Sequence, residues 1–270
     1  MRKLLLAPLL CCAACVDVPT AGAPAAAPLP VESPYQGLDP GYKPEETAHF
    51  VVQAYTSADA AHYAALCEEN YARIMQDLGL YSFAPARPYN VVVYRDSAEF
   101  HSKTGQPDWS GGAAYGNALL LFESGALAST LAHEMTHLVF NEFMGLSQAA
   151  QLRWLNEGVA VYEETRADQT VAAAYAARVR EGVAPDPIPF SQMVNLAPQS
   201  ESSKNVDRWY AQAGSVVGFL VRQGGSFSFS LFLGRLRDGE TVDRALADTY
   251  NGLWKKLPDL EKAWTLEVQR

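Results

Sequence analysis

The sequence predicts an α+β domain whose first half mixes strands with helices and whose second half is helical. Short runs of β-branched and aromatic residues over 48–55 and 90–94 predict strands in the first half. After residue 123, apolar residues recur at helical spacing almost without interruption. With 270 residues, 49% of them hydrophobic and 19% charged, the chain is long and apolar enough to bury a sizeable core.

Helices and strands are expected to alternate in the first half. Ser57 is a candidate N-cap for a helix over 58–78, and Gly79 is the expected stop. Cys67 falls on the apolar stripe of that helix, which indicates a buried core residue rather than a reactive thiol. The rest of this half is expected to contain a short helix over 96–103, a loop over 106–112, and one or two strands over 113–122 with a turn at Gly116 and Asn117.

The second half is expected to be built of helices. A loop over 183–205 is expected to interrupt them, because this stretch contains four prolines. After residue 15 no apolar run is long enough to predict a membrane span, and the chain shows neither an internal repeat nor a glycine-rich phosphate loop. The expected helices cover 126–144, 150–167, 170–182, 206–223, 226–237, 241–250 and 258–269.

Charge and cysteine content exclude several classes of protein. The 21 Lys and Arg residues are outnumbered by 30 Asp and Glu residues, and the formal net charge is −9. A surface this acidic argues against nucleic acids or anionic lipid headgroups as the main partner. Because Cys67 is the only cysteine after residue 15, a framework of intramolecular disulfides is not expected.

The N-terminus has the pattern of a secretory signal. Arg2 and Lys3 precede an apolar stretch over 4–14, which is too short to span a bilayer. The end of this stretch resembles the lipobox of bacterial lipoproteins, although Cys12 stands where that pattern prefers Leu. The resemblance implies a signal peptide over 1–14 and a lipid on Cys15; a plain cleaved signal of a soluble secreted or periplasmic protein is the alternative. Val16, where an Asp would favour inner-membrane retention, favours the outer membrane.

A tether is expected between the lipidated cysteine and the domain, over 15–44. Its part over 18–44 contains seven prolines with Ala, Gly and Ser between them, and no apolar periodicity. Such a segment is expected to be extended and partly polyproline II, which suits a spacer between a membrane and a domain. A leader without a role remains the alternative. The folded domain is expected to begin near Glu45 and to run over 45–270.

A metal-binding pattern lies within the helix expected over 126–144. His133, Glu134 and His137 form HExxH, and residues four apart on a helix share one face. Both imidazoles can therefore reach one Zn²⁺ ion, and a third protein ligand would leave a position for water. Glu134 would lie beside that position and could take the water's proton. The alternative is a core-facing helix whose histidines are hydrogen-bonded and metal-free.

Glu157 is the candidate third ligand of this zinc site. Residues 138–156 separate it from His137, and it falls on the next expected helix. A short loop at Gly145 would let that helix return antiparallel to the first. The flanks of Glu157 are apolar, so the carboxylate would be costly to bury without a partner. The alternative is that Glu157 is a solvated charge.

HEMTH followed by WLNEGVAVY resembles the gluzincin metallopeptidases, the clan that includes thermolysin and aminopeptidase N. The gap between the motifs matches thermolysin, whereas residues 111–116 lack the glutamate of the aminopeptidase motif, which speaks against aminopeptidase activity. The chain looks more like short, peptidase-domain-only members from bacterial envelopes. The resemblance implies a thermolysin-like domain with lobes over about 45–145 and 146–270 and zinc in the cleft between them. A strand within 112–122 would then form the cleft edge and pair with substrate.

The resemblance implies a membrane-anchored zinc endopeptidase of the bacterial envelope that acts on a peptide or protein. Glu134 would serve as the base, and Tyr210 is the candidate donor to the oxyanion, with Tyr115 second. Packing is the alternative role for Tyr210. Two other functions stay open: a zinc-containing module that holds an envelope peptide without turnover, and a peptidase-like domain without metal. The oligomeric state is not predicted.

Five further polar residues are not expected to bind zinc or to take part in the chemistry. One of Glu163 and Glu164 could orient a zinc-bound imidazole, but an exposed helical face is the favoured interpretation. His49, His62 and His101 are scattered along the chain and are expected to be structural or solvated.

Overall fold

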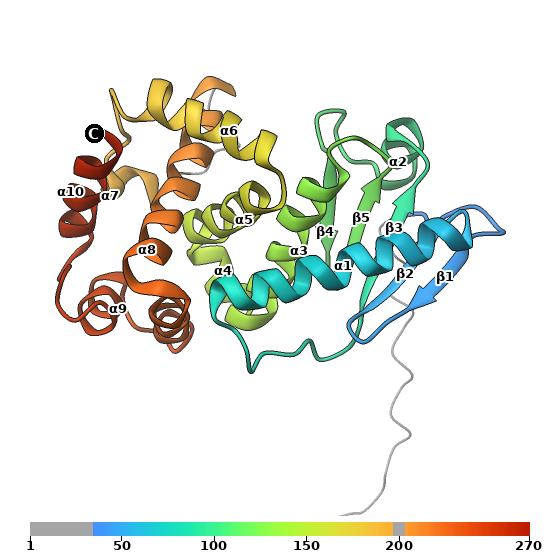
Figure 1. Cartoon of the computed structure of the whole chain (residues 1–270), viewed down its shortest axis with the longest axis horizontal. Helices are drawn as coiled ribbons and strands as arrows, with labels where there is room; N and C mark the ends of the chain where they lie inside the picture. Colours follow the sequence, from blue (N-terminus) through green and yellow to red (C-terminus); the bar gives the residue numbers. More distant parts are fainter. Residues whose placement is uncertain (1–34, 197–202) are drawn as a thin grey trace, which may run out of the picture. The chain divides into compact units, whose positions relative to one another are not determined.

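The computed structural model describes residues 35–196 and 203–270 (Figure 1). The expected signal peptide over 1–14, the lipidation site Cys15 and most of the expected tether lie outside the described residues. The chain from Tyr35 to Arg270 forms one compact unit, a mixed sheet with helices followed by a helical part. The expected α+β class is therefore confirmed at this level.

The sheet has five strands in the order β1-β2-β3-β5-β4. The three central strands, β2, β3 and β5, are parallel, and each outer strand pairs antiparallel with its neighbour. The expected pair of strands over 113–122 is confirmed, with Gly116 in the turn at φ 60°. The strands are β1 (Lys43–Glu46), β2 (Phe50–Ala54), β3 (Tyr89–Tyr94), β4 (Gly112–Tyr115) and β5 (Ala118–Phe122).

Helices cover both faces of the sheet. The face that carries Val91 and Leu119 packs on α1 (Ser57–Leu78) and α3 (Leu127–Met144). The opposite face carries Val92, Tyr94 and Leu120 and packs on Phe100 of α2 (Ser97–Thr104). Burial on both faces explains why these strands are continuous apolar runs rather than alternating ones.

The folded unit begins ten residues before the expected boundary at Glu45. Leu38 is buried against the sheet with Tyr94 and Phe100. Lys103 holds the same segment, because its Nζ lies 2.8 Å from Asp39 Oδ1. The last part of the expected tether thus packs on the domain, because Leu38 is buried and Asp39 pairs with Lys103.

The ends of α1 show which residues start and stop a helix here. The N-cap is Thr56 rather than Ser57, because Thr56 Oγ1 accepts the backbone N–H of Asp59 at 3.1 Å. Gly79 ends the helix in the left-handed conformation, as expected. Cys67 is fully buried, and this burial raises the pKa of its thiol, which confirms its role as a core residue.

The helical part differs from expectation in three places. The helix expected over 150–167 is two helices, and a short helix lies in the loop expected over 183–205. The helices expected over 206–223 and 226–237 are joined at Gly225 into one helical element, and the φ of 71° at this glycine makes a kink. These elements are α4 (Leu146–Gln151), α5 (Arg153–Ala167), α6 (Gln169–Arg178), the short π-helix η1 (Val179–Val183), α7 (Phe190–Met193), α8 (Ser203–Arg237), α9 (Val242–Thr249) and α10 (Leu257–Val268).

In the described part of the chain, one helix is long and apolar enough to cross a membrane by length and composition: Asn205–Arg237 within α8. No such helix is expected from the sequence after residue 15. Its mean hydropathy is 1.3, but half of the apolar window is buried inside the protein. Trp209, Val217 and Phe229 of this helix belong to the core. A core helix passes the same test, so this helix is weak evidence for a membrane span.

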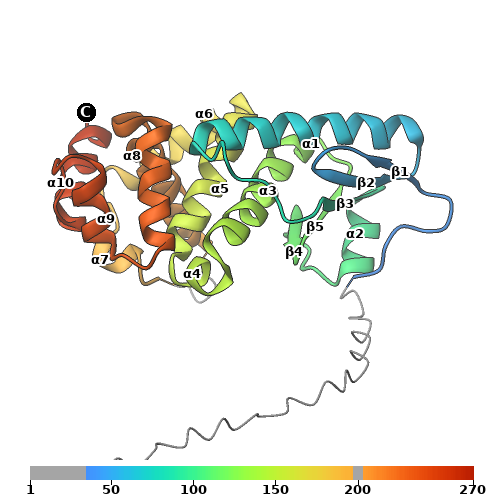
Figure 2. The same ribbon diagram turned by 90° about the horizontal axis from the view of Figure 1, so that it is seen from below.

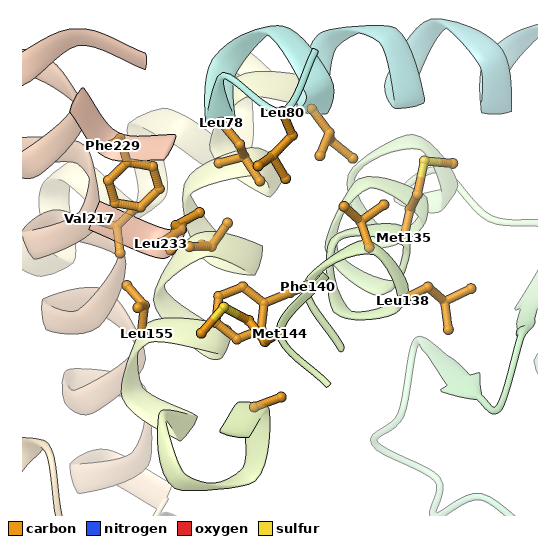
Figure 3. Packing of buried hydrophobic residues seen from close by; sticks show 14 of the residues in the cluster. Leu78, Leu80, Met135, Leu138, Phe140, Met144, Leu155, Val217, Phe229 and Leu233 are labelled. Atoms are coloured by element: carbon orange, nitrogen blue, oxygen red, sulfur yellow. The ribbon is translucent and has the colours of Figure 1, made fainter. Parts of the chain in front are cut away.

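Helix α3 lies at the centre of one continuous core. Figure 3 shows Met135 and Leu138 on the side of α3 nearer the sheet, and Leu155 and Val217 on the side of the helical part. Helix α1 runs past the sheet and α3 and reaches α8, as Figures 1 and 2 both show. The helix with the HExxH sequence is therefore held from both sides.

Candidate metal centre

The packing of α5 on α3 brings together the three residues expected to bind metal. His133 and His137 lie one turn apart on α3, with ring centroids 4.8 Å apart. Glu157 of α5 points at both rings: its Oε2 lies 3.4 Å from His137 Nε2 and 3.8 Å from His133 Nε2. One ligand atom from each residue can be chosen so that all lie within 4.8 Å of one another.

The other nitrogen of each imidazole is held by a residue of α5. His133 Nδ1 lies 3.1 Å from Glu164 Oε2, and His137 Nδ1 lies 2.8 Å from Asn156 Oδ1. These oxygens accept hydrogen bonds, so the ring protons belong on Nδ1 and the lone pairs on Nε2 face Glu157. Two imidazole nitrogens and one carboxylate oxygen form a donor set that zinc uses in catalytic sites. The residues fit a metal ion in ligand type, tautomer and direction.

The charges at this centre are arranged for a cation. Burial alone would lower the pKa of His137, but the hydrogen bond and charge of Glu157 raise it to about 9. Burial alone would raise the pKa of Glu157, and the two histidines together with Arg153 lower it instead. The carboxylate is therefore ionised at neutral pH, and its negative charge faces both imidazoles.

The position of Glu157 depends on the glycine that follows it. A Cβ on Gly158 would lie 2.8 Å from the backbone oxygen of Ala213 in α8, closer than a real side chain tolerates. Trp154 and Leu155 anchor the same helix in the core. Because one face of α5 packs closely against α8, Glu157 on another face of α5 points toward α3.

The expectation of an exposed face at Glu163 and Glu164 is wrong. Glu164 contacts His133, whereas Glu163 is fully buried, 3.4 Å from Arg73 Nε of α1. Within the described residues Glu163 Oε1 has no hydrogen-bond partner. Burial and the charge of Asp77 raise the pKa of this carboxyl to about 8. Both residues are enclosed because α5 packs on α3, α6 and α8 and is reached by Arg73 of α1, which its own sequence does not show.

Glu134 lies on α3 beneath the edge strand β4. A Cβ on Gly112 would lie 3.3 Å from Glu134 Cγ, so the strand passes directly over this side chain. Glu134 is half-buried, and its charge acts on both His137 and Tyr210. Its carboxylate makes no hydrogen bond to any of residues 35–196 and 203–270.

Tyr210 of α8 lies beside the same centre. Burial and then the charge of Glu157 raise the pKa of its phenol to about 12, while the positive charge of Arg153 acts in the opposite direction. Arg153 Nε also lies 4.0 Å from Glu157 Oε1, one helical turn away. Tyr115, the second candidate, is more than half exposed on β4. Arg153 was not expected, although its spacing of four residues from Glu157 signals the contact.

Two further residues extend the contacts around the imidazoles. Tyr175 of α6 lies with its Oη 3.4 Å from Glu164 Oε2. Asn141, one turn beyond His137 on α3, accepts a hydrogen bond from Asn156 Nδ2 at 3.0 Å. Neither residue could be connected with the site from sequence, because each contact joins separate helices.

The remaining three histidines lie outside the centre, as expected. His49 bonds Glu68 at 2.7 Å and stacks on Tyr71. His62 is exposed, and His101 packs edge-on against Phe100. None of the three belongs to the His and Glu cluster found among the described residues.

Comparison with known protein families gives one match. A family model described as the peptidase MA superfamily matches residues 67–269, about three quarters of the chain. The matched region contains every residue of the candidate centre. The search of curated proteins found no match.

Proposed function

Because the chain belongs to the peptidase MA superfamily, we propose that it is a zinc-dependent metallopeptidase that hydrolyses peptide bonds with Glu134 as the base. The observation that carries the proposal is the convergence of His133, His137 and Glu157 from two helices. The hydrogen bonds to both Nδ1 atoms support it, because they prepare both Nε2 atoms for a metal.

His133, His137 and Glu157 would hold the zinc ion. Bound zinc would lower the pKa of a coordinated water toward about 7 and polarise a substrate carbonyl. Glu134 takes the proton of the attacking water and passes it to the leaving amine. Its position under β4, free of hydrogen bonds to the described residues, supports this role.

Tyr210 is proposed as the donor to the oxyanion. Its raised pKa keeps the phenol protonated at neutral pH. The phenol proton is therefore available for a substrate oxygen, while the positive charge of Arg153 also acts on Tyr210. Arg153 would thus position both Tyr210 and the carboxylate of Glu157.

The proposed architecture is thermolysin-like, with the substrate at the edge of the sheet. Support comes from β4, which is an outer strand paired with β5 on one side only. Its free backbone groups can pair with an extended peptide. The lack of a glutamate over 111–116 favours an endopeptidase over an aminopeptidase.

The proposed location is the bacterial cell envelope, with a lipid on Cys15 anchoring the chain, in the outer rather than the inner membrane. The apolar stretch over 4–14 and the small residues before Cys15 support this proposal. Cys15→Ser should move the protein from the detergent phase to the aqueous phase. An unchanged distribution would contradict lipidation.

The function is tested by incubating the full-length chain with a mixed peptide library and analysing the products by mass spectrometry. The wild type should cleave, and Glu134→Gln should lose at least about 100-fold in rate while it still binds zinc. Equal cleavage by both would show that Glu134 is not the base. Zinc binding without Glu134-dependent cleavage would instead support the alternative, a module that holds peptides without turnover.

A further inference from the structure

A cavity of about 310 Å³ lies at the end of α3 beyond His137. Leu138 and Asn141 of α3 form part of its wall, Tyr89 at the start of β3 another part, and Leu146 the far side. The turn between β4 and β5 also borders it, at Gly116. None of these residues has a role in the chemistry proposed above.

Two structural features connect the cavity with the candidate metal centre: a chain of hydrogen bonds and strand β4. Asn141 bonds Asn156, which in turn holds His137. Strand β4 is the second feature, because Gly112 at its start lies over Glu134 and Gly116 after its end borders the cavity. Strand β4 therefore connects the proposed base, at its start, with the cavity, which borders the residue after its end.

The direction of a bound peptide follows from β4. Antiparallel strand pairs outnumber parallel ones about two- to three-fold, and an antiparallel peptide would have its N-terminal side at Tyr115 and Gly116. Strands rise about 3.3 Å per residue, so Gly116 lies about 13 Å along the strand from Gly112. The cavity thus corresponds to a substrate side chain about two to four residues before the scissile bond.

The apolar part of the cavity wall, formed by Tyr89, Leu138 and Leu146, can contact an apolar side chain, and the two amides of the wall are hydrogen-bonded within the protein. Leu146 is 77% exposed although it borders the cavity, so an occupant could cover it. The one acidic group of the wall, Glu142, is already satisfied: its oxygens lie 2.6 Å from Tyr89 Oη and 2.7 Å from the backbone nitrogen of Ala86. Arg87 is exposed at the rim, where water can solvate its charge.

We propose that this cavity is a specificity subsite that takes a large apolar side chain, such as Leu, Met or Phe, on the N-terminal side of the scissile bond. The inference rests on the proposed peptidase function and adds its substrate class. Leu146 would be a specificity-determining residue, since the exposed part of its side chain would be buried by the occupant.

The test compares Leu146→Asp with Leu253→Asp, a control at a residue that is also exposed, at 61%, and does not border the cavity. Leu146 is the first residue of α4, where an acidic side chain is favourable, so the variant should fold. Peptides carry Leu, Ala or Glu at each of the four positions before the scissile bond. Cleavage by the full chain in detergent is measured as kcat/KM, and binding to zinc-loaded Glu134→Gln is measured by fluorescence anisotropy.

The expected result is a preference for Leu over Ala of at least about tenfold at one position, in both cleavage and binding. Leu146→Asp should remove this preference by lowering kcat/KM for the Leu peptide at least about tenfold, whereas Leu253→Asp should leave the preference as it is in the wild type. A preference confined to the C-terminal side of the bond, a preference for Glu, or a Leu preference that Leu146→Asp leaves intact would each overturn the subsite and leave the peptidase function standing. Absence of any Glu134-dependent cleavage would overturn the peptidase function and the subsite together.

Discussion

The two imidazoles of the candidate metal centre are one turn apart, yet their surroundings differ. His133 is held by a carboxylate, Glu164, which Tyr175 of α6 contacts in turn. His137 is held by an amide, Asn156, which bonds the amide of Asn141. The His133 end is thus supported by a charge, and the His137 end by neutral groups.

This difference separates two tasks that a supporting residue can have. A carboxylate orients the ring and also makes it a more basic ligand, whereas an amide mainly orients it. The neutral end is also the end that leads to the cavity beside Asn141. The comparison suggests that metal affinity depends more on the His133 end, and substrate access more on the His137 end.

The largest effect is expected from Glu164→Gln. The variant keeps the size of the side chain but removes the charge beside His133. Zinc affinity should fall toward the upper end of the 10- to 100-fold range for such supporting residues. Competition with a chromophoric chelator would measure it, and an unchanged zinc affinity would show that the charge has no role.

Asn156→Ala is expected to have a smaller effect on the metal. It removes the hydrogen bond that orients His137 and also the hydrogen bond to Asn141, but it changes no charge. Zinc affinity should fall about tenfold by the same assay. A loss larger than that of Glu164→Gln would reverse the comparison of the two ends.

Glu163→Gln is the matched control, because Glu163 neighbours Glu164 but contacts Arg73 instead of a histidine. Zinc affinity should not change. The pKa of this carboxyl is raised from 4.5 to about 8 by burial, so between these values the unfolded chain binds fewer protons than the folded one. Wild-type stability therefore falls as the pH rises through this window, and above it the full loss remains.

Glu163→Gln should lack this loss of stability at high pH, because glutamine does not titrate. Its stability relative to wild type should increase with pH across the same window, by on the order of 1 kcal/mol per pH unit. Urea unfolding at about pH 5 and about pH 8 would measure the difference. If the difference in unfolding free energy between wild type and Glu163→Gln were the same at both pH values, Glu163 would not be a neutral buried acid.

Among the residues that support His133 and His137, the smallest loss of zinc affinity is expected from Tyr175→Phe. Its hydroxyl lies 3.4 Å from Glu164 Oε2, a long contact that adds little to the orientation of the carboxylate. Zinc affinity should fall no more than a few-fold. A loss as large as that of Glu164→Gln would move the main support of His133 from α5 to α6.

The sequence predicted the parts of the centre that depend on one helix or on two motifs. His133 and His137 share a face because of the helical period, and the apolar flanks of Glu157 placed it inside the protein. Their convergence is confirmed by the structure. Their role as zinc ligands, and the role of Tyr210, stay predictions for the experiments above.

The remaining features depend on contacts between distant segments. Lys43–Glu46 is entirely exposed and forms β1 only because its backbone pairs with β2, so no apolar pattern marks it. The split at Leu152 between α4 and α5 carries neither Gly nor Pro. The different environments of Glu163 and Glu164 depend on which neighbouring helix each side chain meets.

Helix α1 has a consequence for how the protein unfolds. Its 22 residues span about 33 Å, and it contacts the sheet, α3 and α8. Through Arg73 it also reaches Glu163 on α5. Because α1 packs on both the sheet part and the helical part, residues 35–270 should melt in one cooperative transition. A chain cut near Gly145 separates the helical part from α1 and α3, so the C-terminal fragment should not fold alone.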